Sequence, residues 1–155
     1  MIQPRRIQPS DDLREFHCGH DSLDDWFRSH ALRAERERTA TTYVILDQEL
    51  VVAYYSLAAH GVERATIGGG RLARNSPDAV PCVLLARLAV DVRWQGKHLG
   101  SSLLAHGVRV ARSAAGMIGL RTIVVGPIDP AAATFYSRYG FRPFPARSDR
   151  MFYPL

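Results

Sequence analysis

The feature that most constrains this fold is a strand–turn–helix pattern in residues 83–115. Residues 83–90 form an apolar run that only Arg87 interrupts, and residues 95–101 form a polar turn with two glycines. The first backbone N–H groups of a helix have no partner within it, so this arrangement predicts an anion-binding turn. Apolar side chains follow at the spacing of a helix, at Leu99, Leu103, Leu104, Val108 and Ala111.

The same residues exclude two common phosphate-binding turns. The helix start carries no Gly-Lys-Ser or Gly-Lys-Thr triplet, which a mononucleotide P-loop requires. Only Gly96 and Gly100 stand in the turn, and no acidic residue follows at the distance typical of a dinucleotide site. On these residues alone, a plain connection between a strand and a helix remains equally open.

The remaining segments predict an α/β fold with a mixed sheet. Besides the helix that starts at Leu99, we expect one from Ser22 as N-cap to near Arg38 and one from Asp129 as N-cap to Gly140. No linker or repeat divides the chain, so residues 1–155 are expected to form a single domain. Extended structure is expected at 41–46, 50–59, 83–90, 121–125, 141–144 and 150–153, with an irregular lead-in at 7–20 and a loop at 61–81.

The composition is that of a globular protein with an anionic partner. Hydrophobic residues make up 46% of the 155 residues, and no run reaches the length of a membrane span. Cys18 and Cys82 are too few for a disulfide framework, which favours a reducing, cytoplasmic setting, and no residues show metal-ligand spacing. The formal charge is +5, and Lys97 is the only lysine among 20 basic residues. Arginine suits phosphate, so CoA and RNA are both candidate ligands, although a genome that prefers arginine codons explains the bias equally well.

The central stretch resembles motif A of the GCN5-related N-acetyltransferases, the GNAT superfamily. That motif reads Gln or Arg, two residues, Gly, one residue, then Gly or Ala. Gln95 and Gly100 match it, whereas His98 stands in place of its middle glycine. Residues 132–141 are similar to the family's last helix, A-x-x-F-Y-x-x-x-G-F. The resemblance implies a single-domain GNAT-like fold, with a mixed, mostly antiparallel sheet whose central strand pair is splayed and flanked by helices.

The resemblance also implies that acetyl-CoA is the co-substrate, with no metal. In the family, this turn binds the pyrophosphate of acetyl-CoA, and the end of the central strand offers backbone groups to the pantetheine arm. The implied acetyl-CoA-binding residues are Leu88, Ala89, Val90, Gln95, Gly96, Lys97, His98, Leu99, Gly100, Ser101 and Phe135.

Tyr136 is the candidate catalytic residue. Transfer of an acetyl group from a thioester to an amine releases a thiolate, which benefits from a general acid. The ordinary pKa of tyrosine is about 10, so the phenol is protonated at neutral pH. GNAT enzymes commonly use a tyrosine at this place in the helix, while core packing beside Phe135 is the alternative role.

Three further segments resemble the GNAT toxins of type II toxin–antitoxin modules. They are F-x-C-G-x-x-x-L-D-x-W-F at residues 16–27, Y-x-L-A at 55–58 and L-A-R-L-A-V-D at 85–91. The resemblance implies that the chain acetylates the α-amino group of aminoacyl-tRNA and so blocks translation. It also implies a ribbon-helix-helix antitoxin as partner and the formation of a homodimer.

Three arginines are candidate substrate-binding residues. Arg87 interrupts an apolar strand, which is costly unless its charge is paired or meets a ligand. A buried ion pair and a contact to a tRNA or CoA phosphate are both open for it. Arg93 and Arg138, together with Lys97, extend the expected basic rim.

Two other functions remain open on the sequence. The chain is also compatible with acetylation of a protein N-terminus or a small amine. The second alternative is a non-catalytic module that binds CoA or RNA, and His98 is the residue that favours this alternative.

Overall fold

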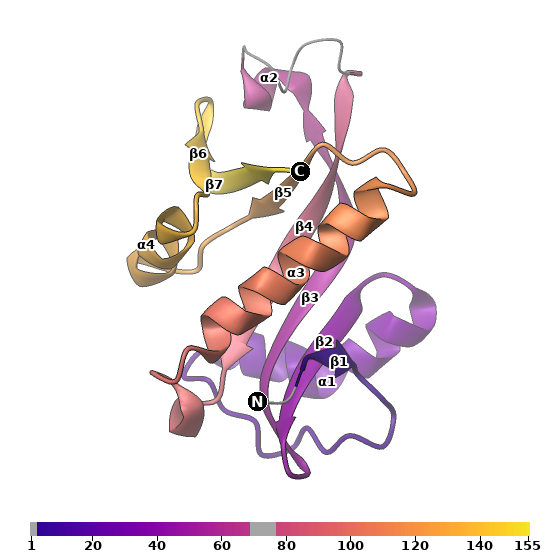
Figure 1. The fold of residues 1–155 in the computed structure, drawn as a ribbon, viewed down its shortest axis with the longest axis vertical. Coiled ribbons are helices and arrows are strands. Elements are labelled where there is room, and N and C mark those ends of the chain that lie inside the picture. Colours follow the sequence, from indigo (N-terminus) through magenta and orange to yellow (C-terminus); the bar gives the residue numbers. More distant parts are fainter. Residues whose placement is uncertain (1–2, 69–76) are drawn as a thin grey trace. The chain divides into compact units, whose positions relative to one another are not determined.

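Four α-helices and seven strands make up the described part of the chain (Figure 1). The structure is a computed structural model that describes residues 3–68 and 77–155. The helices are α1 (Asp21–Glu37), α2 (Arg64–Ile67), α3 (Leu99–Ala115) and α4 (Pro130–Arg138), and a 3-10 turn covers Val92–Trp94. The strands are β1 (Arg5–Arg6), β2 (Thr41–Asp47), β3 (Leu50–Glu63), β4 (Ala79–Val90), β5 (Thr122–Val125), β6 (Arg142–Phe144) and β7 (Arg147–Pro154).

The strands form a mixed sheet in the order β1-β2-β3-β4-β5-β7-β6. Pairing is antiparallel for β1–β2, β2–β3, β5–β7 and β6–β7, and parallel for β4–β5. The parallel pair joins only residues 82–84 of β4 to residues 122–124 of β5, so residues 85–90 of β4 continue beyond the last β5 partner. The predicted mixed, mostly antiparallel sheet with a splayed central pair is therefore confirmed.

The chain groups into two compact units, which are described one at a time. The first unit comprises Met1–Ala58 and Leu85–Arg109, and the second comprises Ala59–Leu84 and Val110–Leu155. The long strands β3 and β4 contribute residues to both units. The extent of one domain over residues 1–155 stays a prediction.

In the first unit, α1 and α3 cover opposite faces of the strands. Tyr54 and Tyr55 are adjacent in β3 and fully buried, and strand alternation directs them to opposite faces. Tyr54 stacks on Phe27 of α1, with 4.1 Å between ring centroids, in a core cluster that also includes Ala89 of β4. On the other face, the Tyr55 hydroxyl lies 2.6 Å from Nδ1 of His106 in α3.

In the second unit, aromatic packing joins the last strands to the end of α4. Phe144 of β6 stacks on Phe152 of β7, with 4.8 Å between ring centroids.

The predicted N-cap of α4 is confirmed, because the Asp129 side chain accepts the N–H of Ala132 at 2.8 Å. Gly140 follows α4 with φ +94°, and a Cβ at this position would lie 3.1 Å from the Tyr153 ring.

The predicted start of α1 is wrong by two residues. The N-cap is His20 rather than Ser22, and no side chain caps this helix. The His20 carbonyl accepts the N–H groups of Leu23 and Asp24, both at 3.1 Å. The Asp24 carboxylate is buried and accepts the N–H of Cys18 instead, so it serves the segment before the helix.

The predicted loop at residues 61–81 is wrong in part. β3 continues to Glu63, α2 follows it, and β4 begins at Ala79. The N–H of Arg64 donates to the carbonyl of Asp78 at 2.8 Å, which closes the connection, and Ile67 is buried in the core of the second unit. Residues 69–76 of this predicted loop lie outside the described residues.

Candidate active site

The turn before α3 has the backbone shape that an anion-binding site needs. Gly96 has φ +79°, and His98, which replaces the middle glycine of the motif, has φ +63°. The His98 carbonyl begins the helix by accepting the N–H of Ser102 at 3.2 Å and the hydroxyl of Ser101 at 2.9 Å. The first N–H groups of α3 have no partner within the helix, and their use as an anion-binding site stays a prediction.

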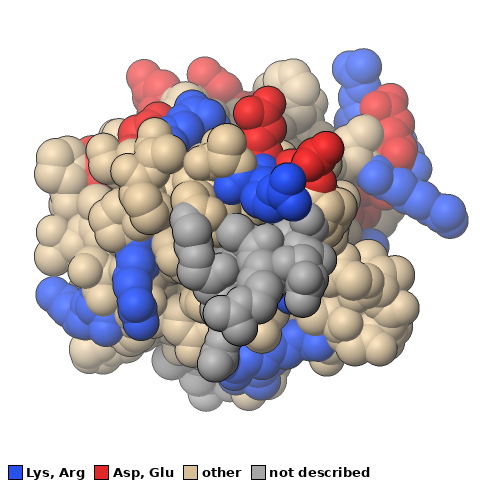
Figure 2. Space-filling view, turned by 90° about the horizontal axis from the view of Figure 1, so that it is seen from above, with Lys and Arg blue, Asp and Glu red and all other residues tan. Residues whose placement is uncertain are grey.

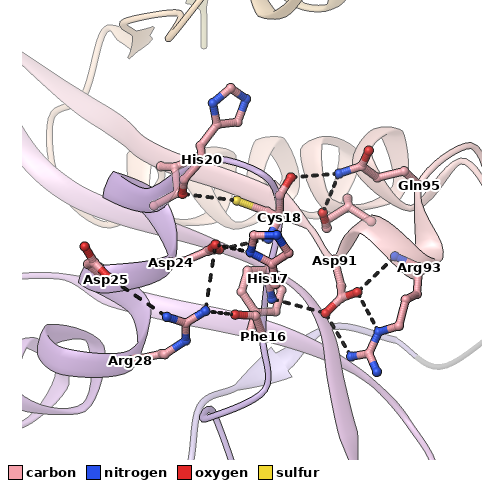
Figure 3. Close-up of polar contacts among 12 residues, drawn as sticks. Phe16, His17, Cys18, His20, Asp24, Asp25, Arg28, Asp91, Arg93 and Gln95 are labelled. Carbon is pink, nitrogen blue, oxygen red and sulfur yellow. Dashed lines mark hydrogen bonds and ion pairs between the residues drawn. The ribbon is translucent and has the colours of Figure 1, made fainter.

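Gln95 fastens this turn to the rest of the first unit. Its side-chain nitrogen donates to the carbonyl of Val90 at the end of β4, at 2.9 Å, and to the carbonyl of Cys18, at 3.0 Å (Figure 3). The amide is thus used to position the turn. Lys97 is exposed, and its Nζ lies 5.1 Å from the centroid of the Trp94 ring.

Two buried carboxylates hold the segment around His17 from opposite sides (Figure 3). Asp24 of α1 accepts the N–H of Cys18 at 2.9 Å and lies 3.0 Å from the His17 ring nitrogen Nδ1. Asp91, directly after β4, accepts the N–H of His17 at 3.2 Å. Burial raises the pKa of Asp91, but the hydrogen bonds from Arg93 and from the His17 backbone outweigh it, so the pKa is lowered overall. No sequence pattern indicated this network.

Neither cysteine has the environment of a nucleophile. Cys18 donates its thiol to the carbonyl of His20, and burial raises the pKa of this thiol to about 12. Burial likewise raises the pKa of the Cys82 thiol to about 11. Both cysteines are free. Within residues 3–68 and 77–155, no group of three His, Cys, Asp or Glu side chains is placed to hold a metal ion, and no helix is long and apolar enough to cross a membrane.

The end of β4 presents backbone groups where the resemblance implies the pantetheine arm. Leu88, Ala89 and Val90 lie beyond the last residue of β4 that pairs with β5. The Ala89 side chain is buried in the cluster under α1, so only its backbone remains for a ligand. The Val90 carbonyl is already taken by Gln95. The acetyl-CoA contacts of these three residues stay a prediction.

The three candidate arginines lie in different environments. In the first unit, the guanidinium carbon of Arg87 lies 3.8 Å from the centroid of the Trp26 ring. Arg93 donates to both carboxylate oxygens of Asp91, at 2.9 and 3.0 Å. In the second unit, Arg138 is exposed at the end of α4, on the wall of an open pocket of about 690 Å³ that Asp149 also lines. No sequence pattern indicated that Trp26 contacts Arg87.

Tyr136 and Phe135 lie side by side in α4 of the second unit. The Tyr136 ring packs against Phe135 and Phe141, with centroid distances of 5.2 and 5.4 Å. Burial raises the pKa of Tyr136 above its ordinary value, so the phenol is protonated at neutral pH. No residue of the described chain hydrogen-bonds its hydroxyl. The ring is therefore a core side chain, while its polar atom has no structural partner among the described residues.

Charged side chains are unevenly placed on the face shown in Figure 2. Acidic side chains lie beside Lys and Arg side chains in the upper part of this view, whereas Lys and Arg side chains in its lower part have no acidic side chain of the described residues next to them.

Comparisons with known proteins agree with the geometry. A model of the acetyltransferase (GNAT) domain matches residues 38–143. A tRNA-acetylating toxin of Mycobacterium tuberculosis is 41% identical over 138 residues, which cover 89% of this chain and 82% of the relative.

Two solved structures of the toxin AtaT are also similar to this chain. The complex of AtaT with acetyl-methionyl-tRNAfMet has a TM-score of 0.90 and 27% identity, and covers 99% of this chain and 95% of AtaT. An AtaT variant bound to the C-terminus of the antitoxin AtaR and acetyl-CoA has a TM-score of 0.83 and 27% identity, with 99% and 92% coverage. The family model and the mycobacterial relative both span most of the described strands and helices, and the chain therefore belongs to the GNAT family of acetyltransferases.

Proposed function

We propose that this chain is an acetyl-CoA-dependent N-acetyltransferase that acts as a toxin by acetylating the α-amino group of aminoacyl-tRNA. The observation that carries the proposal is the 41% identity to a tRNA-acetylating toxin over 89% of the chain. The residues of the site are compatible with this chemistry. An acetylated α-amino group is no longer a nucleophile, so a tRNA modified in this way cannot extend a peptide.

The first turn of α3 binds the pyrophosphate of acetyl-CoA in this proposal. The N–H groups of Leu99, Gly100 and Ser101 have no partner inside the helix, and the helix dipole favours a negative charge there. Gly96 has open space where a Cβ would stand, so the backbone is accessible to a phosphate. Lys97 adds a positive charge beside the turn.

The backbone of residues 88–90 aligns the pantetheine arm. The backbone on this side of β4 extends past its last β5 partner, which leaves polar groups for a ligand to pair with. The role of Phe135 in binding acetyl-CoA is proposed from the family resemblance. Holding the thioester in one orientation beside the amine lowers the entropic part of the reaction barrier.

Tyr136 acts as the general acid. The amine nitrogen forms a bond to the acetyl carbon, the carbon–sulfur bond breaks, and the departing thiolate takes the Tyr136 proton. The amine loses its own proton to water. The α-amino group of an aminoacyl ester has a low pKa because the ester withdraws electrons, so this step needs no dedicated base.

The proposal also covers the protein partner, the oligomeric state and the location of this chain. We assign the chain an antitoxin of the ribbon-helix-helix class, a homodimeric state and a cytoplasmic location. The support is the AtaT variant bound to the C-terminus of AtaR, together with two free thiols that fit a reducing compartment.

The test is transfer of labelled acetyl from acetyl-CoA to a pool of charged tRNA. Deacylated tRNA and free amino acids serve as alternative acceptors in parallel reactions. We expect label on charged tRNA alone. Label on a protein N-terminus or a small amine instead would show that the acceptor is not aminoacyl-tRNA. Failure to bind acetyl-CoA would overturn the assignment as an acetyltransferase.

The Tyr136→Phe variant tests the acid. We expect kcat to fall about 10²- to 10⁴-fold with little change in the KM for charged tRNA. The matched control is Tyr139→Phe, which removes the same hydroxyl from an exposed tyrosine of the neighbouring turn and should leave kcat unchanged. Equal activity of wild type and Tyr136→Phe would show that another group protonates the thiolate.

A further inference from the structure

The Arg87 side chain is held by a stack of aromatic rings. Its guanidinium carbon lies 3.8 Å from the centroid of the half-buried Trp26 ring of α1. Trp26 is stacked on Tyr54, with 6.2 Å between centroids and 16° between planes. The Tyr54 hydroxyl in turn donates to the carbonyl of Leu23 at 2.8 Å. The position of the guanidinium is therefore set by groups that are themselves fixed.

The charge of Arg87 has no acidic partner in the described chain. No carboxylate of those residues lies within ion-pair distance, and no hydrogen bond from its guanidinium is formed to them. Burial lowers the pKa of Arg87, which records the cost of taking this cation out of water. Several other arginines of the same unit each lie within ion-pair distance of a carboxylate, namely Arg5, Arg6, Arg14, Arg28, Arg33 and Arg93.

A guanidinium that is held by stacking and has no acidic partner among the described residues is suited to bind an anionic ligand. A guanidinium that stacks on an indole keeps its in-plane N–H groups free, and these match two oxygens of a phosphate. The stack also lowers the entropy that the side chain would lose on binding. An ion pair within the protein, the alternative that the sequence left open, is not formed among the described residues.

The face of the sheet on which Arg87 lies indicates whether it contacts a phosphate of CoA or of the acceptor substrate. Arg87 and Ala89 are two residues apart in β4, so they point to the same face, and Ala89 packs in the cluster under α1. α3 packs on the other face, against Tyr55. Because the first turn of α3 provides the site for the CoA pyrophosphate, the α1 face is left for the acceptor substrate.

We propose that the Arg87–Trp26 stack binds a phosphate of aminoacyl-tRNA close to its aminoacyl end and thereby positions the α-amino group for acetylation. The proposal rests on the proposed function and adds a substrate subsite to it. Arg87 is the phosphate ligand, and Trp26 is a positioning residue that acts through Arg87.

The experiment measures kcat/KM for charged tRNA at several KCl concentrations with saturating acetyl-CoA, and separately the KM for acetyl-CoA. We expect Arg87→Met to lower kcat/KM for charged tRNA about tenfold to a hundredfold, with the KM for acetyl-CoA unchanged. The slope of log kcat/KM against log salt concentration should become less steep by about 0.7 to 1, the contribution of one phosphate contact. The control is Arg14→Met, which removes the same charge from an exposed ion pair with Asp12 and should change neither quantity.

Three further variants separate binding from folding. Arg87→Lys keeps the charge but loses the planar fork, so it should retain the salt slope and lose part of the rate. Trp26→Leu should lower kcat/KM about threefold to tenfold, and Trp26→Phe should restore most of it. A thermal melt of each variant identifies any that is unfolded, and the conservative variants then carry the test.

Each result of these measurements leads to a different conclusion about Arg87. A rise in the KM for acetyl-CoA, with kcat/KM for charged tRNA unchanged, would assign Arg87 to a CoA phosphate and overturn the proposal. An unchanged salt slope in folded Arg87→Met would also overturn it, because a merely structural residue loses no phosphate contact. If the wild type does not acetylate charged tRNA at all, the proposed function fails first and the subsite falls with it.

Discussion

Asp91 accepts a hydrogen bond from the backbone N–H of His17, 74 positions earlier in the chain and 3.2 Å away. The same fully buried carboxylate receives two hydrogen bonds from the Arg93 side chain and one from the Arg93 backbone. One side chain at the end of β4 therefore anchors both the lead-in segment and the turn that precedes α3.

Asp91→Asn should destabilise the protein. An asparagine side chain replaces a charge-assisted pair with neutral hydrogen bonds, and its amide group presents donors to N–H groups that need acceptors. We expect the free energy of unfolding to fall by about 1–3 kcal/mol, measured by urea denaturation. Asp149→Asn is the matched control, since it breaks an exposed pair with Arg147 and should cost no more than about 0.5 kcal/mol. Equal losses in the two variants would contradict the anchoring role.

Acid should weaken the wild type more than it weakens Asp91→Asn. The pKa of Asp91 is lowered in the folded state below the ordinary value of 3.8. A carboxylate of this kind contributes stability that is fully present above its unfolded-state pKa and is lost as the pH falls through its folded-state pKa. The measurement is the free energy of unfolding between about pH 6 and about pH 2. The two curves should converge below about pH 4, and parallel curves would show that Asp91 does not carry the dependence.

Substitutions at His98 should separate backbone conformation from side-chain chemistry. The residue has φ +63°, a value that glycine adopts freely and a β-branched residue resists. His98→Gly should bind acetyl-CoA at least as tightly as the wild type, whereas His98→Val should bind it about tenfold more weakly. Isothermal titration calorimetry gives both dissociation constants. Weaker binding by the glycine variant would mean that the imidazole itself contacts the ligand.

Gly140→Ala should destabilise the protein through its backbone and a ring contact. The position has φ +94°, and an added Cβ would lie 3.1 Å from the Tyr153 ring. We expect a loss of about 1–2 kcal/mol in the free energy of unfolding. Gly119→Ala introduces the same methyl group where no atom lies within 4 Å, so it should be neutral or slightly stabilising. A neutral Gly140→Ala would contradict the strain assigned to this turn.

Local patterns in the sequence predicted the elements that are stabilised locally. α3 begins at Leu99 as its apolar spacing indicates, and α4 begins after an Asp129 cap followed by Pro130. His98 stands where the family motif has a glycine, and its φ of +63° lies in the region that glycine adopts freely.

No local sequence pattern predicted the contacts between segments that are distant in the chain. With Ser22 as the predicted N-cap, Asp24 would lie in the first helical turn, where the helix dipole favours a carboxylate, whereas in the structure it accepts the N–H of Cys18. Nothing near Arg87 in the sequence points to Trp26 as its partner. α2 was missed because its four residues are held by the Arg64–Asp78 contact across a chain connection rather than by a helical pattern.

The buried state of the two thiols makes the chain convenient for fluorescence work. Cys18 and Cys82 are buried, and their pKa values are raised to about 12 and about 11. At neutral pH both remain thiols rather than thiolates, and a maleimide reacts with the thiolate. A cysteine introduced on the exposed surface would therefore be the preferred attachment point for a dye without removal of either native residue. Association with charged tRNA then becomes measurable in the otherwise unaltered protein.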